Sequence, residues 1–272
     1  MNQYKDIVKQ VADEVMSYLG GYYNEAVYEE AFVHELRLRG IPYERQRNVE
    51  IIYKGFSVGI CRPDCILYPL WSGSKEEFLV EMKSLAKIDK PQIRQAEIYL
   101  ASMNIANGVV LNFNKKTNTA EVVEVLKPTR QVKREIHPQQ LTTNKKITEK
   151  ILEGIVKEVL DYLGSEFFYY SKEGVEIYIR CVAVELRLNN LEFHSLTYPV
   201  LYKSQQVAEY TYDFVFSTGE VAKIFAYKKQ EEFQQQLDEF KFYNKLFNIK
   251  SGYIVAIPFE SELNPIIREI LI

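Results

Sequence analysis

Several segments of this chain of 272 residues occur twice, in the same order. The aligned pairs are 6–20 with 150–164, 28–40 with 178–190, 62–68 with 211–217, and 108–113 with 252–257. The second pair, for example, reads YEEAFVHELRLRG in one copy and YIRCVAVELRLNN in the other. Because a repeat on this scale indicates repeated structural units, we predict two copies of one domain in tandem.

Within the first copy, the hydrophobic pattern predicts a layered α/β domain. Apolar residues at helical spacing predict helices over about residues 6–20 and 24–39, and a proline placed in a first turn predicts a third over 90–102. The β-rich runs that predict strands are 43–53, 56–68, 78–83, 107–113 and 121–126. This order predicts an α/β fold with a mixed central sheet flanked by helices.

The segment between the copies, residues 127–147, has the composition of a linker. It contains six Lys or Arg residues, one Glu and two prolines, and it has neither helical nor strand periodicity. We therefore expect domains at 1–126 and 148–272, joined by a basic linker. The basic run is expected to be a solvated surface, with contact to phosphate as the alternative.

Charged residues interrupt the apolar strand at 78–83. Side chains alternate between the faces of a strand, so Glu81 and Lys83 point the same way. Asp64 ends an apolar run of the preceding strand. A buried charge costs several kcal/mol unless it is paired or binds a metal. Two interpretations remain open: a structural ion pair with Lys83 or Arg62, or a site with a chemical role.

The order of these residues resembles that of the PD-(D/E)XK nuclease superfamily. Asp64, then Glu81-x-Lys83 on the next strand, then Gln95-x-x-x-Tyr99 on a helix carry the resemblance. Residues 5–125 resemble, more narrowly, the GxxExxY family within it. The segments that carry this second resemblance are Leu19-Gly20, Glu25-x-x-Tyr28-Glu29-Glu30-Ala31, ELRLRGI, RPD, VEMKS, Gln95-x-x-x-Tyr99-Leu100 and GVVLNF.

The resemblance implies two restriction-endonuclease-like domains and a nuclease that hydrolyses phosphodiester bonds of nucleic acid, DNA rather than RNA. It implies that Asp64, Glu81 and the backbone carbonyl of Met82 bind Mg²⁺ or Mn²⁺, and that Glu25 completes the site directly or through water. Such hard oxygen ligands suit Mg²⁺, which would activate a water molecule. Lys83 would orient that water or neutralise charge on the phosphate. The Gln-x-x-x-Tyr pair would lie near the active site.

Glu25, Gln95 and Tyr99 also fit purely structural roles. Glu25 lies where an acidic residue favours the start of a helix, whether or not it contacts a metal. Tyr99 fits a core position and Gln95 a surface position, although the two lie one helical turn apart on one face. The glycine that the GxxExxY family has three residues before its glutamate is Tyr22 here.

The second copy lacks most of these residues. It keeps Asp213, but the alignment places Phe225 and Tyr227 opposite the acid and the amine, and Val175 opposite Glu25. We therefore predict that residues 148–272 form a degenerate nuclease-like domain without a metal site. Its expected roles are to pack against the first copy, as in a pseudo-dimer, or to help hold nucleic acid.

Composition restricts the class of protein. No apolar run approaches the roughly 20 residues of a membrane span, and the N-terminus lacks a signal-peptide core, so we expect a cytoplasmic protein. A net charge of -3 argues against a protein that coats DNA nonspecifically and leaves a local basic groove open. The alternative to an enzyme is an inactive module that binds nucleic acid or protein.

Overall fold

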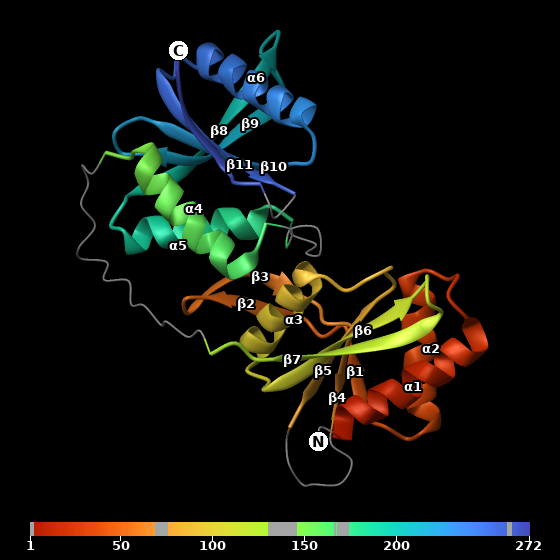
Figure 1. The fold of residues 1–272 in the computed structure, drawn as a ribbon. Coiled ribbons are helices and arrows are strands. Elements are labelled where there is room, and N and C mark those ends of the chain that lie inside the picture. Colours follow the sequence, from red (N-terminus) through yellow and green to blue (C-terminus); the bar gives the residue numbers. More distant parts are fainter. Residues whose placement is uncertain (1–2, 69–75, 130–145, 166, 168–173, 260–262) are drawn as a thin grey trace. The chain divides into compact units, whose positions relative to one another are not determined.

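The computed structural model describes residues 3–68, 76–129, 146–165, 167, 174–259 and 263–272 (Figure 1). The chain divides into two compact units. Met1–Tyr53 and Ser57–Val132 form the first, called here the N-terminal unit, and Lys54–Phe56 and Lys133–Ile272 form the second, the C-terminal unit. Most of the predicted linker, residues 130–145, lies outside the described residues.

The N-terminal unit is a mixed sheet between helices. In chain order its elements are α1 (Gln3–Leu19), α2 (Glu25–Leu38), β1 (Tyr43–Arg45), β2 (Val49–Tyr53), β3 (Phe56–Cys61), β4 (Cys65–Leu67), β5 (Phe78–Lys83), α3 (Lys90–Met103), β6 (Asn107–Asn114) and β7 (Thr119–Leu126). The main sheet has the order β1-β4-β5-β6-β7, in which β5 and β6 are parallel. Strands β2 and β3 form a separate two-stranded sheet, and β2 packs against α3.

The two faces of β5 have different partners. Val80 and Met82 pack with the buried stripe of α1 and with α2 in one apolar cluster. Alternation turns Glu81 and Lys83 to the opposite face, where α3 lies (Figure 1). Close packing on that face requires Gly108 on β6, because an added Cβ would lie 2.7 Å from the Cβ of Leu79. The charged pair is thus held between a sheet and a helix.

Two of the predicted strands are each broken into two. The predicted strand 43–53 is β1 and β2, and the predicted strand 56–68 is β3 and β4. The first break contains Gln46, which has a positive φ of 47°. The second contains Pro63, which has no N–H to donate to a strand ladder. The breaks separate the β2–β3 hairpin from the main sheet and place Asp64 immediately before β4.

The C-terminal unit repeats this architecture. Its elements are α4 (Glu149–Leu163), α5 (Glu176–Leu188), β8 (Phe193–Tyr202), β9 (Gln205–Phe216), β10 (Val221–Tyr227), α6 (Gln230–Leu246), β11 (Ser251–Pro258) and β12 (Ile266–Leu271). The sheet order is β8-β9-β10-β11-β12, and β10 and β11 are parallel. The predicted fold class, two tandem nuclease-like α/β domains, is confirmed. Their origin by duplication stays a prediction.

Equivalent hydrogen bonds fix the correspondence between the two units. The Tyr28 hydroxyl donates to the Gly20 carbonyl at 2.5 Å, and the Tyr178 hydroxyl donates to the Gly164 carbonyl at 2.6 Å. This correspondence keeps Val175 opposite Glu25, as the sequence predicts. It also makes α5 the counterpart of α2.

The strand correspondence corrects one prediction. Asp64 accepts the Met82 N–H, and Asp213 accepts the Ile224 N–H, each at 2.7 Å. Met82 and Ile224 are therefore equivalent, which places Lys223 opposite Glu81 and Phe225 opposite Lys83. The prediction that placed Phe225 and Tyr227 opposite Glu81 and Lys83 was wrong, because the equivalent residues lie two positions earlier in the chain.

The strand pairings agree with this correction. On β6 and β11, Gly108 and Gly252 pair with Leu79 and Val221 of the neighbouring parallel strands. The alignment error arises because the sequence does not show how long the connection between β9 and β10 is. A tight turn at Gly219 (φ 92°) makes this connection short, so β10 begins earlier in the chain than the alignment assumed. Strand β10 still lacks a Glu-x-Lys pair.

Candidate active site

Asp64 is fixed against the neighbouring strand by its backbone and its side chain. Cys65 pairs with Val80 on antiparallel β5, and continuing this register places Asp64 opposite Glu81. The Asp64 Oδ2 atom accepts the Met82 N–H at 2.7 Å, and the Asp64 N–H points to Glu81 Oε2 at 3.5 Å. The two candidate carboxylates are thus neighbours on adjacent strands.

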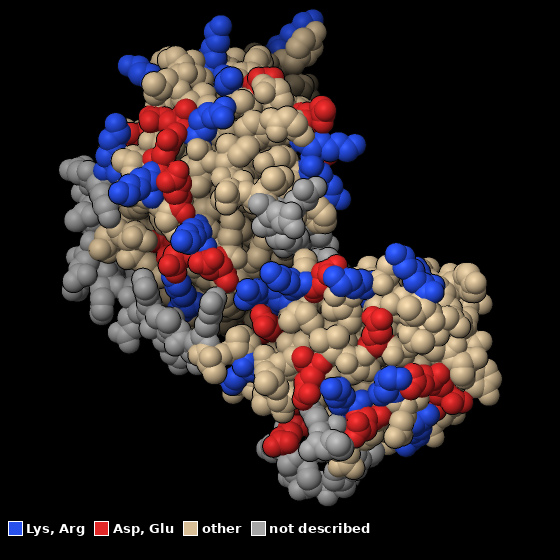
Figure 2. Space-filling model, in the orientation of Figure 1, with Lys and Arg blue, Asp and Glu red and all other residues tan. Residues whose placement is uncertain are grey.

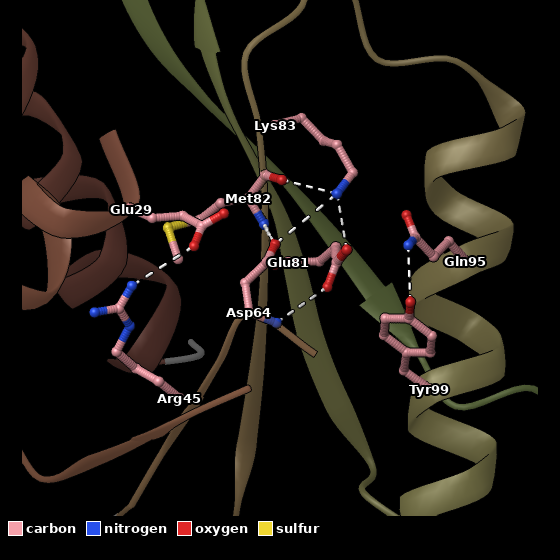
Figure 3. A network of polar contacts seen from close by, with 8 residues as sticks. All are labelled: Glu29, Arg45, Asp64, Glu81, Met82, Lys83, Gln95 and Tyr99. Carbon is pink, nitrogen blue, oxygen red and sulfur yellow. Dashed lines mark hydrogen bonds and ion pairs between the residues drawn. The ribbon is translucent and has the colours of Figure 1, made fainter. Parts of the chain in front are cut away.

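Lys83 completes the cluster. Its ammonium donates to Glu81 Oε1 and to the Met82 carbonyl, both at 2.8 Å, and lies 3.9 Å from Asp64 Oδ2 (Figure 3). Glu81 is 2% exposed and Lys83 6% exposed. Arg62, the other partner considered for these carboxylates, instead donates to Asn48 Oδ1 at 2.6 Å. Three oxygen atoms, from the Asp64 and Glu81 side chains and the Met82 backbone, therefore converge on one buried ammonium group.

The electrostatics show an excess of negative charge. Burial raises the pKa of Asp64, and burial followed by the Asp64 charge raises the pKa of Glu81 to about 8. Burial opposes the charge of Lys83, but Glu81, Asp64 and Glu25 together raise its pKa above the ordinary value. The ammonium is therefore stable at neutral pH, whereas ionisation of both carboxyl groups is costly without further positive charge.

Two glutamates of α2 border this cluster. Glu25 is the first residue of the helix, whose N-cap, Asn24, accepts the Val27 N–H. Glu29 follows one turn later, 3.7 Å from Arg45 (Figure 3). Burial raises the pKa of both, and the charges of Asp64 and Glu25 help to raise that of Glu29 to about 7. The sequence predicts Glu25 but not Glu29, although the i, i+4 spacing places both on one helix face.

Gln95 and Tyr99 lie inside the structure, on α3. The Gln95 amide nitrogen donates to the Tyr99 hydroxyl at 2.8 Å, and both side chains are buried. Burial, followed by the Glu81 charge, raises the pKa of Tyr99 well above its ordinary value. The Gln95 carbonyl oxygen is buried without a hydrogen-bond partner within the described chain. Gln95 is thus not the surface residue considered as the alternative.

A second polar network, not predicted from the sequence, holds the chain beyond Lys83. Asn112 pairs with Lys83 across the parallel strands and is fully buried. Its amide accepts the Leu85 N–H at 2.8 Å and donates to the Leu85 carbonyl at 3.2 Å. Asn114 donates to the Ala86 carbonyl at 3.2 Å, and both asparagines donate to Glu121 of β7. The network fixes the backbone that leaves the charged strand.

The described residues include no group of three or more His, Cys, Asp or Glu side chains placed to hold a metal ion. Asp64 and Glu81 provide two carboxylates, and the third converging oxygen belongs to the backbone of Met82. This donor set fits Mg²⁺, which commonly takes one or two carboxylates and retains several waters. The Lys83 ammonium stands where the oxygens converge, and the raised carboxyl pKa values indicate charge that a divalent cation would neutralise.

Comparison with known proteins finds one family that resembles this unit. None of the curated proteins matches the chain significantly. Within the described parts, none of the helices has the length and apolar character to cross a bilayer. Residues 2–125, which include every candidate site residue, match the sequence profile of the PD-(D/E)XK nuclease superfamily. Over residues 2–125 the chain is therefore similar to the PD-(D/E)XK nuclease superfamily.

Proposed function

We propose that the N-terminal unit is a metal-dependent nuclease that hydrolyses phosphodiester bonds, with DNA as its substrate. The observation that carries this proposal is the convergence of the Asp64 and Glu81 carboxylates and the Met82 carbonyl on the Lys83 ammonium. This set includes the acidic residues and the amine that the superfamily motif requires. It lies in the part of the chain that the family match covers.

In this proposal Asp64, Glu81 and the Met82 carbonyl hold Mg²⁺ or Mn²⁺, and Glu25 reaches the ion directly or through water. An ion held there would supply Lewis-acid chemistry, since it would polarise the phosphodiester and lower the pKa of a bound water. Lys83, released from its contacts, orients the attacking water or neutralises the developing negative charge. Gln95 and Tyr99 line the α3 side of the site, where the Gln95 carbonyl oxygen has no hydrogen-bond partner within the described chain.

The proposed organisation assigns catalysis to residues 1–126 and treats 127–147 as a basic linker. Residues 148–272 are a degenerate domain, because Lys223, Phe225 and Val175 stand where the acid, the amine and Glu25 stand in the N-terminal unit. On the face drawn in Figure 2, basic and acidic side chains are interspersed across the described surface. Nucleic acid is therefore expected to bind at a local site. GxxExxY membership, pairing of the two units and a cytoplasmic location stay predictions.

Cleavage of labelled DNA and RNA, single- and double-stranded, tests this function. Wild-type protein should cleave DNA with Mg²⁺ or Mn²⁺ and should be inactive in EDTA. Lys83→Ala and Glu81→Gln should abolish cleavage, whereas Lys9→Ala, at an exposed lysine of α1, should leave it unchanged. Equal cleavage by wild type and Lys83→Ala would show that the activity has another source.

A second candidate function is an inactive nucleic-acid-binding module. The observation that favours it is the buried 2.8 Å contact between Lys83 and Glu81, in which the amine occupies the position proposed for the metal. Calorimetric titration with Mg²⁺ and Mn²⁺ separates the two candidates. Metal binding that Glu81→Gln removes supports the nuclease, whereas nucleic-acid binding with neither metal binding nor cleavage supports the module.

A further inference from the structure

The loop that joins α1 to α2 displays an aromatic ring to solvent. Tyr22 is 94% exposed, the largest exposure among the large hydrophobic side chains of the described residues, and Tyr23 beside it is 45% exposed. An aromatic ring that remains in water contributes little to folding, because the stability gained from such a ring depends on its burial. The exposed ring therefore calls for a role other than packing.

The backbone of this loop is held on both sides. The Gly20 carbonyl accepts the Tyr28 hydroxyl at 2.5 Å, and the Tyr23 N–H donates to the same hydroxyl at 3.3 Å. Gly21 packs so closely that an added Cβ would lie 3.1 Å from the Lys115 carbonyl. The position of Tyr22 is thus set by its anchored neighbours. A loop whose backbone is already ordered loses less conformational freedom when its side chain binds a partner.

The same loop borders the candidate active site. The Tyr23 carbonyl accepts the Ser84 hydroxyl at 3.4 Å, and Ser84 directly follows Lys83. On the other side of the loop, Glu25 begins α2. The loop that carries Tyr22 therefore borders the polar cluster, since it contacts the residue after Lys83 and leads into the first glutamate of α2.

Basic side chains share this edge of the unit. Lys115 and Lys116 follow β6 and are exposed, and Lys115 lies close enough to Glu25 to oppose the rise in that residue's pKa. Lys87, also exposed, follows β5 and pairs with Asp89 at 2.7 Å. Because β5 and β6 are parallel, their carboxyl ends and these lysines lie at one edge of the sheet. We call Tyr22, Tyr23, Lys115 and Lys116 the rim.

We propose that the rim binds single-stranded nucleic acid, with Tyr22 stacked on an unpaired base and Lys115 and Lys116 on backbone phosphates. This inference rests on the proposed function, since it defines the substrate of the same site. Stacking on a side-chain ring needs the face of a base, which a duplex covers on both sides. The two lysines attract backbone phosphates. A ring beside basic side chains therefore suits a single strand, which offers both exposed base faces and phosphates.

Binding measured in EDTA, without cleavage, tests the rim separately from catalysis. Fluorescence anisotropy with labelled oligothymidylate should show that Tyr22→Ala weakens binding by about tenfold, while Tyr22→Phe retains it. The matched control is Tyr202→Ala, which replaces an exposed tyrosine of the C-terminal unit and should leave binding unchanged. Lys115→Gln and Lys116→Gln should each reduce the slope of log affinity against log salt by about 0.7.

A direct contact can be tested by photochemical cross-linking. An oligonucleotide that carries 5-iododeoxyuridine should cross-link to Tyr22, as identified by mass spectrometry, and a duplex of the same sequence should not. The proposal is overturned if wild-type protein binds no single strand, if Tyr22→Ala binds as wild type does, or if Tyr22→Ala weakens duplex and single strand equally. Failure of the proposed function would give a different result. Cleavage would be absent or independent of metal, while Tyr22→Ala would still lose single-strand binding selectively.

Discussion

Replacing Glu81 by glutamine should stabilise the metal-free protein, and more strongly at high pH. Glu81 is 2% exposed and has Asp64 as its neighbour. Burial, followed by the Asp64 charge, raises its pKa to about 8. Glutamine has nearly the shape of the protonated acid and can still accept the hydrogen bond that Lys83 donates at 2.8 Å. The substitution therefore removes the unfavourable ionisation and keeps the packing.

The direction of the pH effect follows from the raised pKa. Between the ordinary value of 4.5 and about 8, the folded protein holds a proton on Glu81 that the unfolded chain has lost. Wild-type stability therefore falls as the pH rises through this interval, and Glu81→Gln lacks this loss. At about 1.4 kcal/mol per pKa unit, full ionisation removes roughly 5 kcal/mol. We expect a gain in the free energy of unfolding below about 1 kcal/mol near pH 5, and of about 3–5 kcal/mol near pH 9.

Hydrogen exchange of the β5 and β6 amides in EDTA is the suitable assay, because it reports the N-terminal unit even if the two units unfold separately. The matched control is Glu50→Gln, at an exposed glutamate of β2, which should change stability by less than about 0.5 kcal/mol at either pH. Glu81→Gln that stabilises equally near pH 5 and pH 9, or that destabilises near pH 9, would refute the reasoning.

Individual contacts and the raised Glu81 pKa lead to three more predictions. Asn112→Leu should lower the free energy of unfolding by about 2–4 kcal/mol in chemical denaturation, because the Leu85 N–H and carbonyl lose their partner; an unchanged midpoint would contradict this. Gly108→Ala should destabilise by about 1–3 kcal/mol, since its Cβ would lie 2.7 Å from Leu79, whereas Gly154→Ala, in open space on α4, should stabilise by about 0.5–1 kcal/mol. Magnesium affinity at the two carboxylates should weaken as the pH falls below about 8, with protons released on binding in calorimetry; pH-independent affinity would argue against that site.

The helices and the strands β5 and β6 could be predicted from the sequence because their signals are local. Apolar residues recur at helical spacing in α1, and the run at 78–83 is apolar enough to be recognised as a buried strand. The breaks at Gln46 and Pro63 depend on contacts across the sheet. The Gln46 N–H donates to the Asp64 carbonyl at 3.3 Å, a contact between segments that periodicity cannot connect. Pro63 was the one local signal for a break.

Part of the candidate site could also be predicted from the sequence, and part could not. Asp64, Glu81 and Lys83 are found by sequence reasoning because charges within apolar strands stand out against their neighbours. Asn112 and Asn114 carry the same kind of signal, polar residues two apart in an apolar strand, and could have been found by it. Their partners could not, since the segment they hold has no motif. Tyr99 at a core position was one of the two interpretations that the sequence left open, and its burial is consistent with either.

Comparison with the C-terminal unit shows how strongly each motif residue argues for catalysis. Asp213 keeps the hydrogen bond to the neighbouring strand that Asp64 makes, although Lys223 and Phe225 replace the acid and the amine. An aspartate at this position therefore has a structural use that needs no metal, and Asp64 alone is weak evidence for catalysis. Lys223 pairs with Asp213 at 3.2 Å, so an amine beside the aspartate also has a structural use. The glutamate has no such use, because the same sheet forms without an acid at its position in the C-terminal unit. Retaining a buried glutamate that the fold can do without is the stronger reason to expect chemistry at Glu81.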